Sequence, residues 1–427
     1  MDKLIVQGGA DLSGRINISG SKNSSLPILA ATLLTEEACI VRNVPDVSDT
    51  NYLIQIMNAI GGHVERSSGT VRIEAANIHH EAPYDLVRKM RASICVMGPL
   101  LGRLGKAKVS LPGGCVIGDR PIDLHLKGFE ALGAEITMDG GDITVEAPNG
   151  LTGAHINLRG KHGPTVLGTD NVMMAATLAK GTTVIESAAC EPEVYDLAEF
   201  LNAMGAKISG HGTRTITIEG VEKLHGVDHT VIPDRIEAAT FMVAGIMAST
   251  SGITLRRVRR DHLTAAEEML LAAGHTVEFN EQGTEVFVKK GDAPKGCEII
   301  TAPYPGFPTD MQAQFTAMLA LTPGISVVED TIFPQRFMQC SELKRMGANI
   351  EVDNGRAVVH GVGQLSGAPV MASDLRASAA LVLAGLKASG ETEISRLYHI
   401  DRGYEHIDEK LEMLGATVTR VPDHGRE

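Results

Sequence analysis

The chain has 427 residues, of which 43% are hydrophobic, 4% aromatic and 21% charged, and none is tryptophan. These proportions are typical of a globular protein of about two domains and exclude a disordered chain. The net charge of −13 argues against broad binding to nucleic acids or anionic membranes. We expect no signal peptide and no membrane span, because every apolar run is short. Six scattered cysteines without a C-x-x-C pair predict reduced thiols in a cytoplasm.

One short pattern recurs six times along the chain, first as AIGGHVE at residue 59 and last as MLGATVT at residue 413. Neighbouring copies are separated by 68 to 73 residues. So constant a period predicts six copies of one supersecondary unit. The copies share a glycine, at Gly61, Gly133, Gly205, Gly274, Gly347 and Gly415.

An amphipathic helix is predicted before each shared glycine, and strands after it. In EPEVYDLAEFLNAMG, Val194, Leu197 and Leu201 recur at helical spacing. Gly205 then suits the left-handed conformation that ends a helix. Downstream, Ile216 and Ile218 alternate with polar residues, as in a half-buried strand.

Each copy also holds a second helix without a polar face, as in NVMMAATLAKG, EAATFMVAGIMAS and SAALVLAGLKASG. A helix that is apolar all round must be covered on every side. We therefore expect close-packed central helices, with the sheets and amphipathic helices outside. Three copies would form each domain, with a short boundary near residues 224–233.

Polar residues lie directly upstream of these buried helices. They are Lys22 and Asn23, Arg91, Asp234, Asp310, and Asp374 with Arg376. Helix N-termini carry unpaired N–H groups and favour anions. The pattern predicts a cleft that binds a strongly anionic small molecule. The alternative is that these residues only cap helices or form salt bridges.

The stretch SLPGGCVIGDRP sets Cys115 in a loop rich in glycine and proline, five residues before Arg120. Such a loop permits the turns and movement of a lid. A neighbouring arginine would favour the thiolate form of Cys115.

Seven motifs together resemble the UDP-N-acetylglucosamine 1-carboxyvinyltransferase family of enolpyruvyl transferases. They are GSKNSSLPILAA, MRAS, LPGGCVIGDRPIDLHL, PDRIEAATF, FPTDMQAQF, DLRASAALVLAG and YHIDRGYE. The resemblance runs from residue 1 to about residue 421 and implies an α/β fold of two similar domains. Each domain would hold three βαβαββ units around central buried helices, as an inside-out α/β barrel. It implies domains at 22–232 and at 1–21 plus 233–427, with the active site in the interdomain cleft.

The resemblance also implies a reaction. Enolpyruvyl passes from phosphoenolpyruvate to the 3'-hydroxyl of UDP-N-acetylglucosamine by addition and elimination, and phosphate is released. This is the first committed step of peptidoglycan synthesis, which serves cell-wall growth and cell division. No organic cofactor, metal, nucleic acid or membrane is needed, and we expect a cytoplasmic monomer. The alternatives are a related enzyme such as 3-phosphoshikimate 1-carboxyvinyltransferase, or a catalytically silent binding protein on the same scaffold.

The matching positions carry roles over by resemblance. Cys115 would donate the proton, form a covalent adduct with phosphoenolpyruvate and react with fosfomycin, whereas Asp310 would be the base. The phosphoenolpyruvate contacts would be Lys22, Asn23, Arg120, Arg376 and Arg402. The UDP-sugar contacts would be Arg91, Arg120, Pro121, Ile122, Asp123, Leu124, Asp310 and Ile332. Arg336, Asp374, Glu191 and Asp234 would support these residues.

One stretch departs from the family pattern. RGKHGPTVLGTDN, residues 159–171, is about three residues longer than the compact segment of many members. The family's loop touches the uridine and its diphosphate, so Lys161, Thr165 and Val166 are candidate contacts here. Basic character in this stretch suits a diphosphate.

Overall fold

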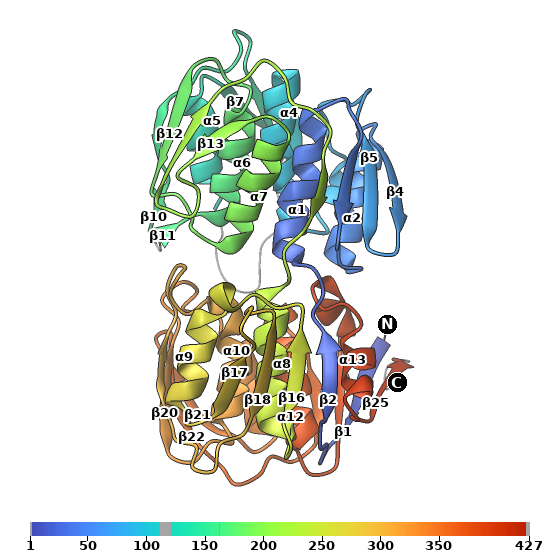
Figure 1. The fold of residues 1–427 in the computed structure, drawn as a ribbon, viewed down its shortest axis with the longest axis vertical. Coiled ribbons are helices and arrows are strands. Elements are labelled where there is room, and N and C mark those ends of the chain that lie inside the picture. The colour runs from blue at the N-terminus through green and yellow to red at the C-terminus, as the bar shows by residue number, and fades with distance from the viewer. Residues whose placement is uncertain (1, 112–120, 162, 424–427) are drawn as a thin grey trace. The chain divides into compact units, whose positions relative to one another are not determined.

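The computed structural model describes residues 2–111, 121–161 and 163–423, which form two compact units. The first unit comprises residues 20–111 and 121–232, and the second comprises 2–19 and 233–423. Within the described ranges, the chain passes from one unit to the other at Ser19 and Gly20 and again at Ile232 and Pro233 (Figure 1).

Three buried helices form the centre of the first unit (Figure 1). They are α1 (Lys22–Ala31), α4 (Met97–Leu104) and α6 (Val166–Ala176), with short 3-10 turns η1 (Thr32–Leu34) and η2 (Arg91–Val96) beside them. Gly98 permits the closest approach, because a Cβ there would lie 2.3 Å from the backbone oxygen of Asn171 on α6. Outside them lie α2 (Ser48–Ala59), α3 (Tyr84–Val87), α5 (Asp123–Ala131) and α7 (Pro192–Ala203).

Small sheets cover the helices of the first unit. One runs β15-β3-β5-β4, from Asp228–Thr230, Cys39–Arg42, Thr70–Glu74 and His63–Ser67. A second runs β6-β8-β7, from Lys106–Ser110, Asp142–Glu146 and Glu135–Asp139. A third runs β9-β12-β14-β13, from His155–Asn157, Thr182–Glu186, Thr215–Glu219 and Lys207–Ser209. The β15–β3 and β9–β12 pairs are parallel and the other pairs antiparallel.

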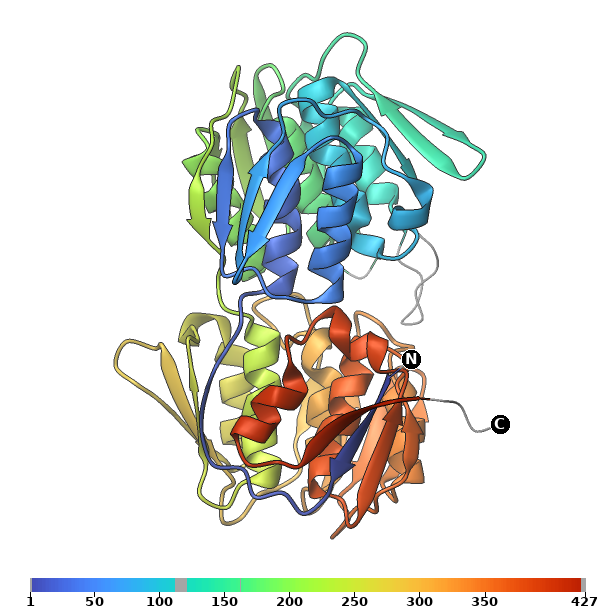
Figure 2. The ribbon, with the colours of Figure 1, turned by 90° about the vertical axis from the view of Figure 1, so that its right-hand side faces the viewer.

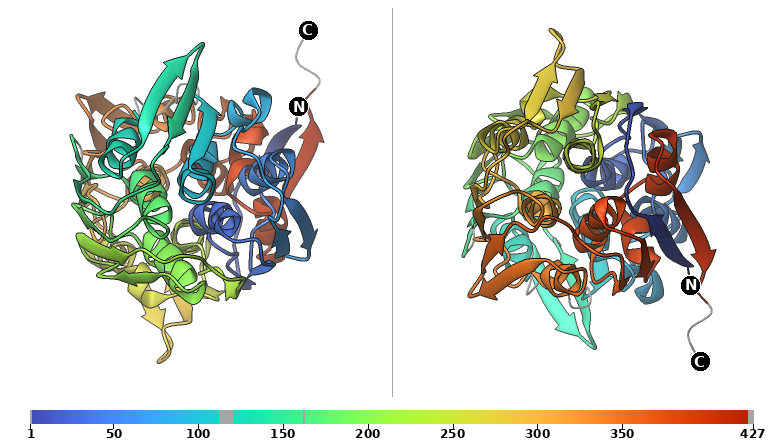
Figure 3. Two further views of the ribbon diagram at one scale, coloured as in Figure 1. Left: turned by 90° about the horizontal axis from the view of Figure 1, so that it is seen from above. Right: turned by 90° about the horizontal axis from the view of Figure 1, so that it is seen from below.

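The second unit repeats this plan around α8 (Arg235–Ala248), α10 (Gln312–Leu319) and α12 (Leu375–Lys387), as the view from below in Figure 3 shows. Its outer helices are α9 (Thr264–Ala272), α11 (Met338–Arg345) and α13 (Ile407–Met413), and its short turns are η3 (Arg260–His262), η4 (Thr309–Met311) and η5 (Leu397–Arg402). One sheet is β17-β18-β16-β2, from Thr276–Phe279, Glu285–Lys289, Ile253–Arg256 and Gly14–Asn17. Another is β19-β20-β22-β21, from Glu298–Ile300, Ile325–Glu329, Arg356–His360 and Asn349–Asp353.

The N-terminal strands complete the second unit. The last sheet is β23-β24-β1-β25, from Pro369–Met371, Glu391–Ser395, Asp2–Gln7 and Val418–Pro422. β1 pairs antiparallel with both β24 and β25, and β2 pairs parallel with β16 (Figure 2). The sixth repeat therefore differs from the expected complete copy, because its helix α13 is followed by one strand and β1 supplies the other.

The shared glycines end the outer helices. Each of the six has a positive φ, between 88° and 102°, in the region that favours glycine. The three apolar segments quoted above form α6, α8 and α12, and almost every residue of α8 is buried. These observations confirm the predicted helix ends and central helices, as well as the α/β class. Within the described part of the chain, no helix is both long and apolar enough to cross a membrane.

Candidate active site

The start of α1 presents the first predicted site residues. Ser21 caps the helix, and its side-chain oxygen accepts from the Ser24 amide at 3.2 Å. Lys22 is the first helical residue, and its Nζ lies 3.3 Å from the Asp49 Oδ2 at the start of α2. Both side chains are largely buried, so the ammonium is held in one place. Asn23 follows, half-buried.

Two of the predicted UDP-sugar segments of the first unit meet at a small hairpin. β10 (Arg159–Gly160) pairs with β11 (Gly163–Pro164), and the exposed Lys161 lies in the turn. A Cβ at Gly160 would meet the Leu124 Cδ1 at 3.1 Å, so hairpin and α5 are in contact. Next in the chain, Thr165 caps α6 by accepting from the Gly168 amide at 3.2 Å, and Val166 begins the helix.

The remaining candidates of this group lie at element starts. Asp123 begins α5, after an exposed Pro121 and a buried Ile122. Arg91 begins η2 and is half-buried. The structure thus places these residues at or just before the starts of α5 and η2.

A buried carboxyl cluster lies beside this region and was not predicted. Asp170 on α6 is 1% exposed, and its Oδ1 has no hydrogen-bond partner among the described residues. Burial, followed by the charges of Glu191 and Glu193 at the start of α7, raises the pKa of Asp170 well above its usual value. On the same helix, Asn171 bonds the buried His125 Nδ1 at 2.9 Å.

In the second unit, Asp310 lies between two buried arginines. Its Oδ1 accepts from Arg336 Nη1 at 2.7 Å and its Oδ2 from Arg376 Nη2 at 3.1 Å. The arginine side chains are 6% and 3% exposed, whereas that of Asp310 is 28% exposed. The carboxylate is therefore fixed by charge-assisted bonds and still faces solvent. Asp310 does not act as the N-cap of its turn, a position that Pro308 occupies.

A second carboxylate, Asp330, orders the neighbouring loop. It accepts from the Thr301 and Thr309 hydroxyls at 2.8 and 2.7 Å. It also accepts from the amides of Ile332 and Phe333 at 3.0 and 2.8 Å. These bonds hold Ile332, the predicted apolar contact, close to the turn that carries Asp310.

Two N–H donor groups of Arg376 are not used by the rest of the described structure. Its Nε and Nη1 are buried and have no hydrogen-bond partner among the described residues. Its guanidinium lies 5.4 Å from the centre of the Tyr404 ring. Burial acts to lower the pKa of Arg376, but Asp310, followed by Tyr404 and Asp234, raises it above its usual value. The arginine is thus always charged, and two of its donors are not used by the described residues.

A buried polar network that the sequence did not indicate contacts both Asp310 and Arg376. The Tyr404 hydroxyl bonds Thr240 at 2.9 Å and Gln314 at 3.1 Å, and Gln314 Nε2 donates to the Asp310 backbone oxygen at 2.9 Å. Tyr404 lies in the YHIDRGYE motif and Gln314 in FPTDMQAQF. Membership of these two motifs was the sequence signal that could have pointed to both residues.

The two other aspartates cap helices. Asp374 accepts from the Arg376 and Ala377 amides at 2.8 and 3.1 Å, and Asp234 accepts from two amides of α8 at 2.9 Å. Asp374 thus holds Arg376 through its backbone amide. Arg402 ends η5, half-buried, and its charge adds to burial in lowering the pKa of His399.

Cys115 and Arg120, together with His162 of the longer loop, lie outside the described residues. The other five cysteines are free thiols, and burial raises the pKa of each. Among the described residues, no group of His, Cys, Asp or Glu has an arrangement suited to a metal ion.

Comparison with known proteins gives a consistent result. The family model for EPSP synthase (3-phosphoshikimate 1-carboxyvinyltransferase) matches residues 6–411. A UDP-N-acetylglucosamine 1-carboxyvinyltransferase of Akkermansia muciniphila is 67% identical over 99% of both chains. The one of Methylacidiphilum infernorum is 58% identical, also over 99% of both.

Solved structures agree with this fold. The enolpyruvyl transferase NikO from Streptomyces tendae has a TM-score of 0.88 at 26% identity, over 98% of both chains. EPSP synthase from Acinetobacter baumannii has a TM-score of 0.76 at 20% identity, over 99% of this chain and all of its own, and so supports the fold alone. The chain belongs to the enolpyruvyl transferase family, and within it to the UDP-N-acetylglucosamine 1-carboxyvinyltransferases.

Proposed function

We propose that the protein transfers the enolpyruvyl group of phosphoenolpyruvate to the 3'-hydroxyl of UDP-N-acetylglucosamine and releases phosphate. The observation that carries this proposal is the 67% identity, over 99% of both chains, to an enzyme of that name. Asp310 between Arg336 and Arg376 supports it, because the reaction needs a carboxylate beside cations.

We assign the steps as follows. Asp310 takes the proton of the sugar 3'-hydroxyl while the hydroxyl oxygen attacks C2 of phosphoenolpyruvate. Cys115 gives a proton to C3. The Cys115 thiolate then takes a proton back from C3, which re-forms the double bond as the bond from C2 to the phosphate oxygen breaks. The phosphate leaves with that electron pair and accepts the proton held by Asp310. Arg376 with its unpaired donors, Lys22, Arg120 and Arg402 would bind the phosphate and carboxylate. Protonation of Asp310 would leave two buried guanidiniums short of an anion, which favours retention of the charged intermediate.

The nucleotide sugar would contact the first unit at Arg91, at residues 120–124 and at the hairpin with Lys161, Thr165 and Val166, and the second unit at Ile332. Contact between the hairpin and Leu124 supports the grouping of these segments. Asn23 would lie between the two substrates, and Glu191, Asp234 and Asp374 would support the arginines. We place the reaction in peptidoglycan synthesis, in the cytoplasm and in a monomer.

The direct test measures phosphate release from phosphoenolpyruvate with each acceptor. Wild-type protein should release phosphate with UDP-N-acetylglucosamine, whereas Asp310→Asn and Cys115→Ser should release it far more slowly. Asp353→Asn, at an exposed position of β21, is the matched control and should keep full activity. Activity with shikimate 3-phosphate alone would assign the related reaction, and binding of both substrates without turnover would assign a silent binding protein.

A further inference from the structure

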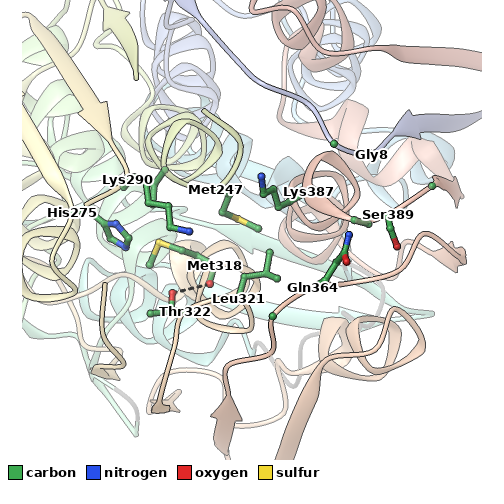
Figure 4. A pocket seen from close by; sticks show the side chains of 15 residues that line it. Gly8, Met247, His275, Lys290, Met318, Leu321, Thr322, Gln364, Lys387 and Ser389 are labelled. Carbon is green, nitrogen blue, oxygen red and sulfur yellow. Dashed lines mark hydrogen bonds between the residues drawn. The ribbon is translucent and has the colours of Figure 1, made fainter. Parts of the chain in front are cut away.

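A cavity of about 410 Å³ opens in the second unit, at the C-terminal ends of its three central helices. Met247 of α8, Met318 of α10 and Lys387 of α12 line it (Figure 4). The candidate active-site residues Asp234 and Arg376 lie at the opposite ends of α8 and α12. A helix of 14 residues, such as α8, is about 20 Å long, so the cavity is a separate site.

The titratable side chains that line this cavity are all nitrogen donors. Its lining contains Lys290, Lys387 and His275 but no Asp or Glu, in a chain whose net charge is −13. Neither lysine has an ion pair or hydrogen bond with a described residue. Lys387 attracts the Asp11 carboxylate, but that carboxylate is occupied by the amide and hydroxyl of Thr250.

His275 is the most informative of these groups. It is 6% exposed, and its Nδ1 accepts from the Gly291 amide at 3.4 Å. The proton of the neutral ring therefore lies on Nε2. Nε2 is buried and has no hydrogen-bond partner among the described residues. A buried donor without a partner costs free energy, which a bound acceptor would recover.

The lysines alone would have a simpler explanation. Lys387 is in the last turn of α12, where a cation complements the helix dipole. The helix dipole does not explain why the Nε2–H donor of His275 has no partner in the described part of the chain, and it does not explain why a cavity lies there. Two carbonyls at these helix ends are occupied, since Leu386 accepts from the Ala10 amide and Ala248 from the Leu12 amide. The titratable side chains of the lining are all nitrogen donors, which offset the negative ends of the three helix dipoles and suit an anion.

The floor of the cavity is apolar. Met247, Met318 and Leu321 lie together in Figure 4, and Lys290 extends toward them from the end of β18. Small-molecule sites typically combine an apolar wall with a few polar groups in a volume of this order.

We propose that this cavity binds a small organic anion, in which a carboxylate or phosphate monoester contacts Lys290, Lys387 and the His275 Nε2–H and an apolar body lies on the methionines. The inference does not depend on the proposed catalytic function. The site would be a second ligand site on the unit that carries Asp310.

The test follows His275 by long-range ¹H–¹⁵N NMR while benzoate, phenyl phosphate or neutral benzyl alcohol is added. The chain has 15 histidines, so His275→Gln assigns the resonance. Either anion should shift the His275 signals below about 10 mM, whereas benzyl alcohol should not. A shift with only one anion identifies the headgroup, and an equal effect of benzyl alcohol would refute an anion site.

Equilibrium dialysis of the same anions gives an independent measurement on charge variants. Lys290→Gln and Lys387→Gln should each weaken binding two- to fivefold. Lys289→Gln is the matched control, because Lys289 is exposed, adjacent in the chain and outside the lining. Absence of binding, or equal affinity in all three variants, would overturn the proposal.

Discussion

Replacement of Lys410 by methionine should destabilise the protein strongly at alkaline pH and only weakly at acidic pH. Lys410 Nζ contacts the Glu237 carboxylate and donates to the Ser19 hydroxyl at 2.6 Å. The side chains of Lys410 and Glu237 are 13% and 3% exposed. Glu237 also accepts from the Ser19 amide at 3.4 Å and lies near Asp234, so Lys410 is its counter-charge.

Burial raises the pKa of Glu237 to about 7, against the opposite effect of Lys410. A carboxyl whose pKa is raised by folding contributes stability below its unfolded value, near 4.5, and this contribution is lost as the pH rises through about 7. In Lys410→Met the lost counter-charge raises the pKa of Glu237 further. An ionised Glu237 would then be a buried charge without a partner, which costs about 3–5 kcal/mol. A protonated Glu237 would lose one hydrogen bond, or about 1 kcal/mol.

Urea unfolding of the wild type and the variant at about pH 5.5 and about pH 8.5 measures the loss of unfolding free energy at each pH. Lys344→Met, on the exposed side of α11, controls for the loss of a lysine. An equal loss of unfolding free energy at the two pH values would refute the assignment of Glu237 as the titrating group.

Three further changes test other parts of the structure. Asp310→Asn should lower the rate of phosphate release about 10²- to 10⁴-fold, because an amide cannot take the hydroxyl proton; a rate within tenfold of wild type would contradict this role. Asp170→Asn should raise the free energy of unfolding near pH 7, measured with urea, by about 1–3 kcal/mol, because the raised pKa of Asp170 reflects an unfavourable buried charge; this gain should disappear as the pH falls below the usual aspartate pKa. Gly98→Ala should cost about 3 kcal/mol, since its Cβ would lie 2.3 Å from the Asn171 oxygen, and Gly102→Ala, with its nearest atom at 3.3 Å, should cost clearly less in the same urea titration.

Local patterns were enough to predict the repeated elements. The turn after each outer helix requires a positive φ, so the six glycines recur where the chain reverses. Continuous apolar character marked α6, α8 and α12 as central. Both signals come from residues close together in the chain.

Pairing between distant segments was not predictable in this way. Nothing in DKLIVQ indicates that β1 pairs with β24, whose register joins Leu4 to Ile394. Similarly, Lys22 was singled out but its partner Asp49 was not, because Asp49 lies in the first turn of an outer helix rather than a central one. Arg336 was associated with Asp310 through the family resemblance, whereas Arg376 was expected only as a phosphoenolpyruvate contact, since sequence spacing gives no distance between side chains.

The position of β1 has a consequence for synthesis on the ribosome. β1 is made first, but β24 and β25, its partners, begin at residues 391 and 418. At about 5–20 residues per second, this strand would wait roughly 20–80 s for them. During that interval the whole of residues 20–232 leaves the ribosome and can fold. The apolar Leu4 and Val6, fully buried in the finished protein, are meanwhile a nascent segment that a chaperone could bind.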